Sequence, residues 1–584
     1  MDTNGDKQVK NKFAIFFILI IFGFIVFVAM LLVWSNMDRD LPNFKASETK
    51  TALRGVILSQ DNYTLAATKR LYEVSIDTRN LDPNKKDLFV KLYSIYSGDS
   101  EQNVRAAINK KSGSVILSYK IDSKQAEHLR SLAKTLLRLG VFKSYQNPQD
   151  GKVIFNGMDV VESGEMRIYP YKDTLEPLIG YTNKINMGRI VKREGVKGIE
   201  RYYDDRLASI QDSYLVGSRD ISNTIILNRN IQAKERIDGQ GIQISIPLKF
   251  QKIVENTLDK YKKQLEAKEI ITVVMKSDTG DILSIATSNR YDRNSVKDIS
   301  LMNINAVEYT YQPGSVMKPI IYAILLRENK VNPNDVVNIY GGKYKLGQFW
   351  IKDEHVFESN WVSAENIIVY SSNIGIAQLS QRLDTLSYYK GLTDFGITQR
   401  SQIDLSYENT GYIGSLNGEV YKGNVGYGYG LHVNFMQLIK AFNVFNNDGF
   451  MVNPKIATFI IDKFGKRHEI GYDPKSSVLP ENVAKTVQKT LIKAVTVGTG
   501  LKAQVDGITT GGKTGTAEIR KDGKIVGYDS SFIGFANDDK GNRYTIGVLV
   551  IEPSRNYFGA QSAAPIFRDI TLSMIEEGYL KKAL

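Results

Sequence analysis

Hydrophobic residues form one uninterrupted run close to the start of the chain. Residues 13–34 make a 22-residue stretch without a charged side chain, which is long enough to cross a bilayer as a helix. Lysines precede the run, and this charge bias predicts a cytoplasmic tail over residues 1–12 and an extracytoplasmic remainder. A cleaved signal peptide is disfavoured, because the run is too long and no small-x-small cleavage motif follows it. We therefore expect a single-pass anchor in the cytoplasmic (inner) membrane.

After this run, shorter patterns typical of a mixed α/β domain follow. Residues 35–53 are polar and predict a short stalk. Residues 71–76 alternate apolar and polar positions as a strand does, and residues 124–139 carry leucines at helical spacing up to Gly140. We expect residues 35–235 to form this N-terminal domain.

A second set of patterns begins near residue 236 and continues to the end of the chain. Strands are predicted at 242–246, 271–275, 282–286 and 544–551, and helices at 250–265 and 564–574. Strands at both ends with helices between them predict an antiparallel sheet covered by helices. We assign this α/β domain to residues 236–584.

Charge and cysteine content narrow the classes of function. The 584-residue chain has a formal net charge of +13, but its basic residues are scattered and form no arginine-rich run. Outside the membrane, this charge is better explained by attraction to anionic lipid or to a polyanionic envelope than by binding of nucleic acid. A basic, solvated surface with no binding partner is an equally good explanation. The absence of cysteine excludes disulfides, thiolate zinc sites and iron–sulfur clusters.

The first of three chemical motifs lies at Ser315. This serine follows a Gln-Pro-Gly turn and opens an apolar segment, so we expect it in the first turn of a helix. Lys318 lies three residues on, which places both side chains on one helical face. The ordinary lysine pKa of about 10.4 is too high for a base at neutral pH, but burial or a nearby cation lowers it. Ser-x-x-Lys also occurs at Ser47, Ser131 and Ser387, so the pattern has weight only together with the other motifs.

The second motif is Ser371-Ser372-Asn373, a polar group embedded in apolar sequence. Such residues need partners when they are buried, and a helix cap is the ordinary explanation. In a catalytic interpretation, Ser371 relays a proton between Lys318 and the leaving amine, and Asn373 holds a substrate amide. The four histidines of the chain lie in no recognisable triad context, which favours a serine–lysine device over serine–histidine–aspartate.

The third and most specific motif starts at Lys513. We expect Lys513 to bind a substrate carboxylate and, as a like charge, to lower the pKa of Lys318. Thr514 and Thr516 supply hydroxyl donors, and Gly515 lacks the side chain that would block a substrate lying along the strand.

The same region formally matches a nucleotide-binding P-loop, from Gly507 to Thr514. A P-loop needs an apolar strand before it and a helix after it. Here the preceding segment is short and polar, and Asp522-Gly523 predicts a hairpin after the motif. These features disfavour the P-loop interpretation.

Together, the three motifs resemble those of penicillin-binding proteins and serine β-lactamases. Further segments, at 54–57, 167–170 and 195–200, resemble the N-terminal pedestal domain of class B penicillin-binding proteins. Segments 426–431 and 557–560 are most similar to the cell-division transpeptidases of the FtsI type. One departure is Ser-Gln-Asp-Asn at 59–62, where the family usually has Asp-Arg-Asn-Gly.

The resemblance implies a penicillin-binding transpeptidase fold preceded by a pedestal domain, and a D,D-transpeptidase that cross-links peptidoglycan at the division septum. Ser315 would attack the D-Ala-D-Ala bond of a stem peptide, and the acyl group would pass to an amine on a neighbouring strand. Backbone N–H groups of Ser315 and Thr516 would form the oxyanion hole. The family uses no metal or cofactor, is inhibited by β-lactams, and works with an FtsW-type membrane glycosyltransferase and other divisome proteins.

Several alternatives use the same site. An elongation-type transpeptidase and a carboxypeptidase differ only in the acceptor or the cellular location. A β-lactamase is disfavoured by the anchor and the pedestal domain, and a bifunctional synthase by the lack of a glycosyltransferase motif. A non-catalytic β-lactam sensor or scaffold would be expected to have lost a motif residue, and none is missing.

Overall fold

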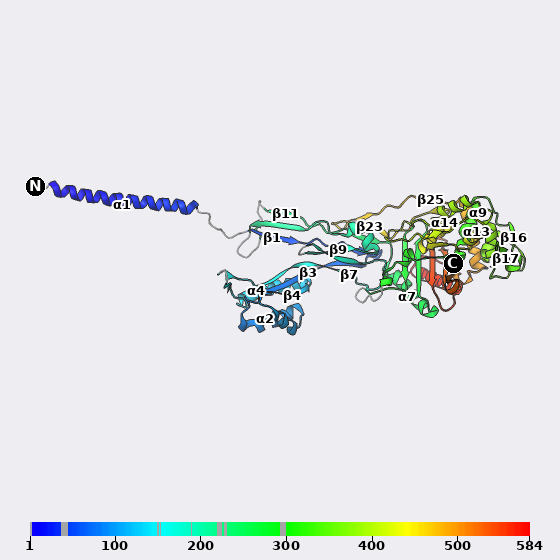
Figure 1. The fold of residues 1–584 in the computed structure, drawn as a ribbon, viewed down its shortest axis with the longest axis horizontal. Coiled ribbons are helices and arrows are strands. Elements are labelled where there is room, and N and C mark those ends of the chain that lie inside the picture. Colours follow the sequence, from blue (N-terminus) through cyan, green and yellow to red (C-terminus); the bar gives the residue numbers. More distant parts are fainter. Residues whose placement is uncertain are drawn as a thin grey trace. The chain divides into compact units, whose positions relative to one another are not determined.

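The computed structural model describes most of the chain. The described residues are 3–36, 45–148, 151, 153–187, 190–218, 225–226, 231–292 and 299–583. They divide into two compact units, one of Met1–Lys50 with Ser213–Arg236 and the other of Thr51–Asp212 with Ile237–Leu584. The order of the elements can be followed from blue to red in Figure 1.

The first unit contains the apolar helix and a small sheet. Helix α1 spans Thr3–Asn36, and its segment Lys12–Asn36 is long and apolar enough to cross a membrane, with a mean hydropathy of 3.3. Strands β1 (Lys45–Lys50), β10 (Ser213–Ser218) and β11 (Gln232–Lys234) form an antiparallel sheet. Within the segment predicted as a stalk, β1 pairs backbone to backbone with a strand that is distant in the sequence, so residues 45–50 are part of a sheet.

The second unit begins with a sheet packed against helices. The long strand β3 (Thr64–Asp77) pairs with β4 (Ser114–Ile121) and β7 (Met158–Ile168). Helices α2 (Lys86–Ser97), α3 (Glu101–Lys110) and α4 (Ser123–Arg138) share a hydrophobic core with this sheet. The strand predicted at 71–76 and the helix predicted at 124–139 are confirmed. Asp122 and Gln125 form a capping box at the start of α4, which fixes that boundary.

Three charged residues from distant segments meet where this sheet approaches the rest of the unit. Arg54 Nε and Arg167 Nε each donate to the Glu200 carboxylate at 2.7 Å, and all three side chains are at most 1% exposed. Arg54 also donates to Asp204 at 2.6 Å. A side chain at Gly55 would lie 1.9 Å from the Gln240 carbonyl, so only glycine fits there. Removing one partner of such a buried network leaves an unpaired charge, which typically costs about 3–5 kcal/mol.

The C-terminal part of the unit is built on a five-stranded antiparallel sheet in the order β14-β13-β28-β27-β26. The strands span Ile282–Thr287 (β14), Glu269–Lys276 (β13), Arg543–Ile551 (β28), Lys524–Asn537 (β27) and Thr509–Lys521 (β26). Alternate residues of β28 face opposite cores: Val548 and Val550 belong to the same hydrophobic core as Phe567, whereas Leu549 belongs to the core that contains Phe442. Helices α7 (Leu248–Leu265) and α16 (Ala563–Glu576) cover the first face, and α14 (Phe435–Asn446) covers the second. The predicted antiparallel sheet covered by helices is confirmed.

The other helices are η1 (Pro83–Lys85), α5 (Gly198–Tyr202), α6 (Asp204–Leu207), η2 (Ile299–Met302), α8 (Asn305–Glu308), η3 (Gly314–Met317), α9 (Lys318–Arg327), η4 (Tyr340–Gly342), α10 (Ala364–Val369), α11 (Asn373–Ser380), α12 (Thr385–Asp394), α13 (Glu419–Gly426), α15 (Glu481–Thr496) and η5 (Leu501–Ala503). The other strands are β2 (Ile57–Leu58), β5 (Tyr145–Gln146), β6 (Val153–Ile154), β8 (Thr182–Met187), β9 (Ile190–Gly195), β12 (Gly241–Ile244), β15 (Thr310–Tyr311), β16 (Val336–Asn338), β17 (Lys343–Leu346), β18 (Phe349–Lys352), β19 (Trp361–Ser363), β20 (Tyr412–Ile413), β21 (Leu431–Asn434), β22 (Phe450–Met451), β23 (Ala457–Ile461), β24 (Arg467–Glu469) and β25 (Ser476–Ser477).

Candidate active site

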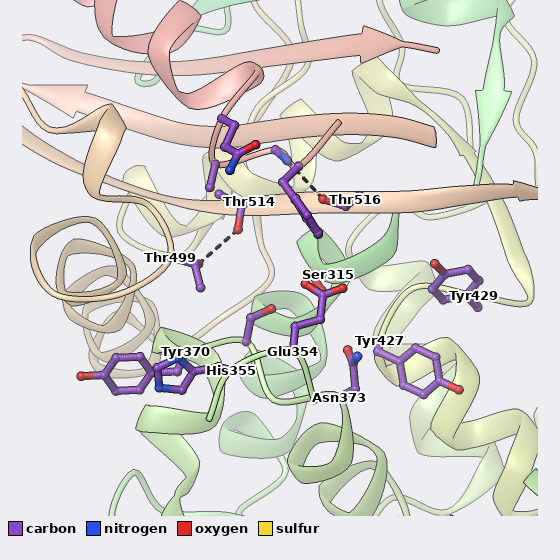
Figure 2. A pocket seen from close by; sticks show the side chains of 15 residues that line it. Ser315, Glu354, His355, Tyr370, Asn373, Tyr427, Tyr429, Thr499, Thr514 and Thr516 are labelled. Atoms are coloured by element: carbon purple, nitrogen blue, oxygen red, sulfur yellow. Dashed lines mark hydrogen bonds between the residues drawn. The ribbon is translucent and has the colours of Figure 1, made fainter. Parts of the chain in front are cut away.

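The three sequence motifs meet at one cavity of about 260 Å³ between the edge strand β26 and the helices beneath it (Figure 2). The predicted residues that line it are Ser315, Ser371, Asn373, Thr514 and Thr516. Lys318 and Lys513 are completely buried beside them. Residues as far apart in the chain as Ser315 and Thr516 are thus brought together, as the catalytic interpretation requires.

Ser315 lies in the short 3₁₀ helix η3, which continues into α9. Gly314 has a φ of +61°, and a side chain on Gly428 would lie 1.9 Å from the Gly314 carbonyl. The Gly314 N–H also donates to the Gly428 carbonyl at 3.1 Å. The serine is therefore held by a close backbone contact that only glycine permits. Its predicted place in the first turn of a helix is confirmed.

Lys318 joins the first motif to the second. Its Nζ donates to the Ser371 carbonyl at 2.6 Å, to Ser371 Oγ at 3.1 Å and to Asn373 Oδ1 at 2.7 Å. Burial lowers the pKa of Lys318 to about 7, although the carboxylates of Asp353 and Glu354 act in the opposite direction. These three acceptors satisfy the three N–H groups of an ammonium. A neutral amine has only two N–H groups and a lone pair, so Ser371 Oγ can then donate to the amine.

The second motif is oriented by a carboxylate that the sequence did not reveal. Asp353 accepts from Ser372 Oγ and the Asn373 N–H, both at 2.6 Å, and from the Ile374 N–H at 3.0 Å. Ser372 Oγ accepts from the Gly375 N–H at 2.8 Å, so Ser372 and Asp353 together cap α11. The helix-cap explanation therefore applies to Ser372. Ser371 precedes the cap with a φ of +65°, a strained conformation for a residue with a side chain.

The third motif lies on β26, where Lys513 Nζ contacts the Thr514 carbonyl at 3.1 Å and Thr514 Oγ1 at 3.3 Å. Burial, together with repulsion from the Lys318 ammonium, lowers the pKa of Lys513 well below its usual value. Lys513 was predicted to lower the pKa of Lys318 as a like charge. This prediction needs correction, because burial is the main cause of the low pKa of Lys318.

Gly515 has a packing role that the sequence did not predict. A side chain at Gly515 would lie 2.5 Å from Ser531 Oγ and 3.0 Å from the Pro313 carbonyl. The glycine is thus required for packing against the segment before Ser315. On the next residue, Thr516 Oγ1 accepts a hydrogen bond from the Gly559 N–H at 3.1 Å.

Comparison with known families decides what this arrangement is. The family described as the penicillin binding protein transpeptidase domain matches residues 270–572. The chain belongs to the penicillin-binding protein transpeptidase family. The penicillin-binding protein dimerisation domain matches residues 49–244.

Relatives and solved structures of this family extend over most of the chain. Stage V sporulation protein D of Bacillus subtilis is 27% identical, over 90% of this chain and 78% of its own length. Peptidoglycan D,D-transpeptidase FtsI of Buchnera aphidicola is 25% identical, over 70% of each chain. The crystal structure of penicillin binding protein 2X from Streptococcus thermophilus has a TM-score of 0.74 at 20% identity, over 92% of this chain and 82% of that one. The fold of this penicillin-binding protein is therefore shared across distant sequences.

The structure adds cavity residues that sequence reasoning missed in this penicillin-binding protein. They include Glu354, His355, Tyr370, Tyr427, Tyr429 and Thr499 (Figure 2). The His355 ring stacks on Tyr370, with ring centroids 4.7 Å apart, and Thr499 Oγ1 accepts from Thr514 Oγ1 at 3.1 Å. Tyr427 and Tyr429 belong to segment 426–431, in which Gly-Tyr occurs twice, and this pattern could have marked them as site residues. The other four residues lie in no recognisable motif.

The structure also bears on two other kinds of site, a nucleotide-binding P-loop and a metal site. Strands β26 and β27 form a hairpin around Asp522-Gly523, so the third motif is followed by a strand and not by the helix of a P-loop. Across the described ranges, no group of three or more histidine, aspartate or glutamate side chains is placed to hold a metal ion.

Proposed function

We propose that this protein is a serine-type peptidoglycan D,D-transpeptidase that is acylated by β-lactams. The observation that carries the proposal is the position of Lys318, buried between the serine motif and the second motif with a pKa of about 7. A buried lysine near its titration midpoint at neutral pH is a competent general base. Family membership and the name of the relative FtsI support the substrate class.

The chemistry follows from the contacts around the lysine. Neutral Lys318 removes the proton of Ser315, and Ser315 Oγ attacks the carbonyl between the two D-alanines. The backbone N–H groups of Ser315 and Thr516 stabilise the oxyanion. The C–N bond breaks, and Ser371 passes the proton from Lys318 to the departing D-alanine amine. An acceptor amine then attacks the ester and frees Ser315.

The test uses a stem-peptide donor that ends in D-Ala-D-Ala together with an amine acceptor. We expect released D-alanine and a cross-linked product by mass spectrometry, both of which penicillin abolishes. D-alanine release without any cross-linked product would identify a carboxypeptidase. The absence of both products, despite penicillin binding, would identify a sensor or scaffold.

We propose in addition that Lys513 binds the substrate carboxylate, with Thr514 beside it. Burial and the nearby Lys318 lower the pKa of Lys513 in the empty site, and an entering carboxylate acts in the opposite direction, because a nearby negative charge favours the ammonium form. Lys513→Ala should slow acylation by carboxylate-bearing β-lactams by roughly tenfold or more beyond its effect on an uncharged reactive ester. The measurement is the second-order acylation rate for each compound. Equal losses for both compounds would exclude carboxylate recognition as the main role.

At the cellular level, we propose that the protein works at the division septum, anchored by residues 13–34 with residues 1–12 in the cytoplasm and residues 35–584 outside. Its partner there is an FtsW-type membrane glycosyltransferase within the divisome. The likeness to FtsI supports this role, and cross-linking requires glycan strands from a polymerase. Residues 35–235 form the pedestal, and residues 236–584 carry the transpeptidase site.

Replacing residues 13–34 with an unrelated spanning helix tests this partnership. We expect the swapped protein, imaged as a fluorescent fusion, to lose its septal location or its support of division. If the swap is tolerated but changes on the pedestal surface are not, the contact lies in the pedestal and the helix is a tether. Continued division after both changes together would disprove the partnership.

A further inference from the structure

One carboxylate in the cavity has no assigned task. Glu354 lines the cavity, is exposed, and points toward Ser315 in Figure 2. Among the residues that the structure describes, none forms a hydrogen bond or ion pair with its carboxylate. The carboxylate is nevertheless close enough to act on the titration of both Lys318 and Lys513. A negative charge in a site that recognises a carboxylate on its donor needs a chemical reason.

The neighbouring residue shows that Glu354 is not simply part of the helix cap. Asp353 uses both of its oxygens on Ser372 and the start of α11. Its own N–H donates to the Gly342 carbonyl at 3.1 Å, and the Lys352 carbonyl accepts from Asn373 Nδ2 at 3.0 Å. The backbone immediately before Glu354 is therefore held by contacts to Gly342 and to the second motif. The fold positions this carboxylate but leaves it free to bind a ligand.

The two substrates of a transpeptidase differ in charge. The donor ends in a carboxylate, which Lys513 attracts. The acceptor is an amine, and a primary amine with a pKa near 10.4 arrives as an ammonium ion. We propose that Glu354 binds the ammonium group of the acceptor and so selects cationic amines for attack on the acyl-enzyme. The inference rests on the proposed transpeptidase function and assigns a substrate-binding residue to its second half-reaction.

In the transfer step, the acceptor nitrogen gives up two protons. The acceptor ammonium, paired with Glu354, loses one proton to neutral Lys318 and becomes a nucleophilic amine. The nitrogen attacks the ester carbonyl, a C–N bond forms, and the bond between the carbonyl carbon and Ser315 Oγ breaks. The attacking nitrogen loses a second proton. One of the two protons ends on Ser315 Oγ and the other is released to solvent, which leaves a neutral amide.

Pairing with Glu354 concentrates the acceptor in this cavity as its ammonium form, and the base Lys318 activates it by removing a proton. The carboxylate holds the cation near the ester, and the adjacent amine of Lys318, with a pKa of about 7, is the proton acceptor. A hydroxyl acceptor such as water gains nothing from the carboxylate charge. Glu354 should therefore favour aminolysis of the acyl-enzyme over its hydrolysis.

The test is the Glu354→Gln variant, which keeps the size of the side chain and removes its charge. A thioester donor is mixed with Nα-acetyl-lysinamide, a cationic acceptor, or with hydroxylamine, which is uncharged near neutral pH. The readout is the ratio of aminolysis to hydrolysis, which does not depend on how fast the acyl-enzyme forms. We expect Glu354→Gln to lower this ratio roughly tenfold for the cationic amine and to leave it nearly unchanged for hydroxylamine.

Glu358→Gln is the matched control, because Glu358 is an exposed glutamate four residues further on that does not line the cavity. It should leave both ratios at the wild-type value. Equal falls for both amines, or no fall for either, would overturn the assignment of Glu354. Covalent labelling by penicillin separates this outcome from a failure of the proposed function. If Glu354→Gln is labelled but its selectivity is unchanged, only the acceptor site is contradicted. If the wild-type protein is not labelled, the transpeptidase assignment itself is contradicted.

Discussion

Ser315→Ala is expected to abolish the covalent adduct that the wild-type protein forms with penicillin, as measured by the intact mass of the protein. Ser315 lies in η3 and lines the cavity, one turn before the buried Lys318. Without Oγ, no atom at this position can form the ester, so the loss should be complete rather than partial. The Ser315 side chain is small and lines an open cavity, so the fold should be retained.

A second Ser-x-x-Lys pair in the same unit supplies the control. Ser387 Oγ donates to Asp384 at 2.6 Å, and Lys390 pairs with Asp394 at 2.9 Å. This serine therefore hydrogen-bonds to Asp384, the residue that caps α12, and its lysine is an exposed member of a surface ion pair. Ser387→Ala should form the wild-type amount of adduct. An undiminished adduct in Ser315→Ala would place the nucleophile elsewhere and reject the assignment.

These two Ser-x-x-Lys pairs show which parts of the site could be predicted from the sequence. Local pattern identified the helix that carries Ser315 and the hairpin of β26 and β27, because turn residues and apolar periodicity are short-range signals. The order of the three motifs then distinguished Ser315 from the Ser387 decoy. In contrast, Asp353 and Glu354 lie in an irregular segment after β18 and acquire their surroundings only when that segment reaches α11. No periodicity encodes such a contact.

The same limit applies to the causes that were assigned to known motif residues. Gly515 was expected to make room for substrate, and its packing against Pro313 and Ser531 was not foreseen, because the fold alone brings these residues close. Either burial or a nearby cation was expected to lower the pKa of Lys318, and the structure shows that complete burial is the main cause. In the pedestal, residues near Arg54, Arg167 and Glu200 were noted by resemblance, and the structure shows that these three form one buried ionic network.

Lys318→Met is expected to slow acylation by penicillin by at least about 10²-fold, because it removes the general base and leaves no other base in hydrogen-bond contact with Ser371 among the described residues. Wild-type acylation should also depend on pH. The reactive form of Lys318 is the neutral amine, so the rate should fall about tenfold per pH unit below the pKa of about 7 and level off above it. The variant should lose this dependence. Stopped-flow rates from pH 5.5 to 8.5, a range of about three units around that pKa, check both expectations.

Lys440→Met distinguishes loss of the base from general damage to the core. Lys440 is a second buried lysine, whose pKa burial lowers to about 8, and it donates to the Ser401 carbonyl at 3.0 Å and to Asn453 Oδ1 at 2.6 Å. It does not line the active-site cavity. Its substitution should lower the melting temperature yet leave the pH profile of acylation unchanged. If Lys318→Met acylates within a fewfold of the wild-type rate and keeps the inflection near pH 7, another group is the base, and Lys318 serves instead to hold Ser371 and Asn373 in place.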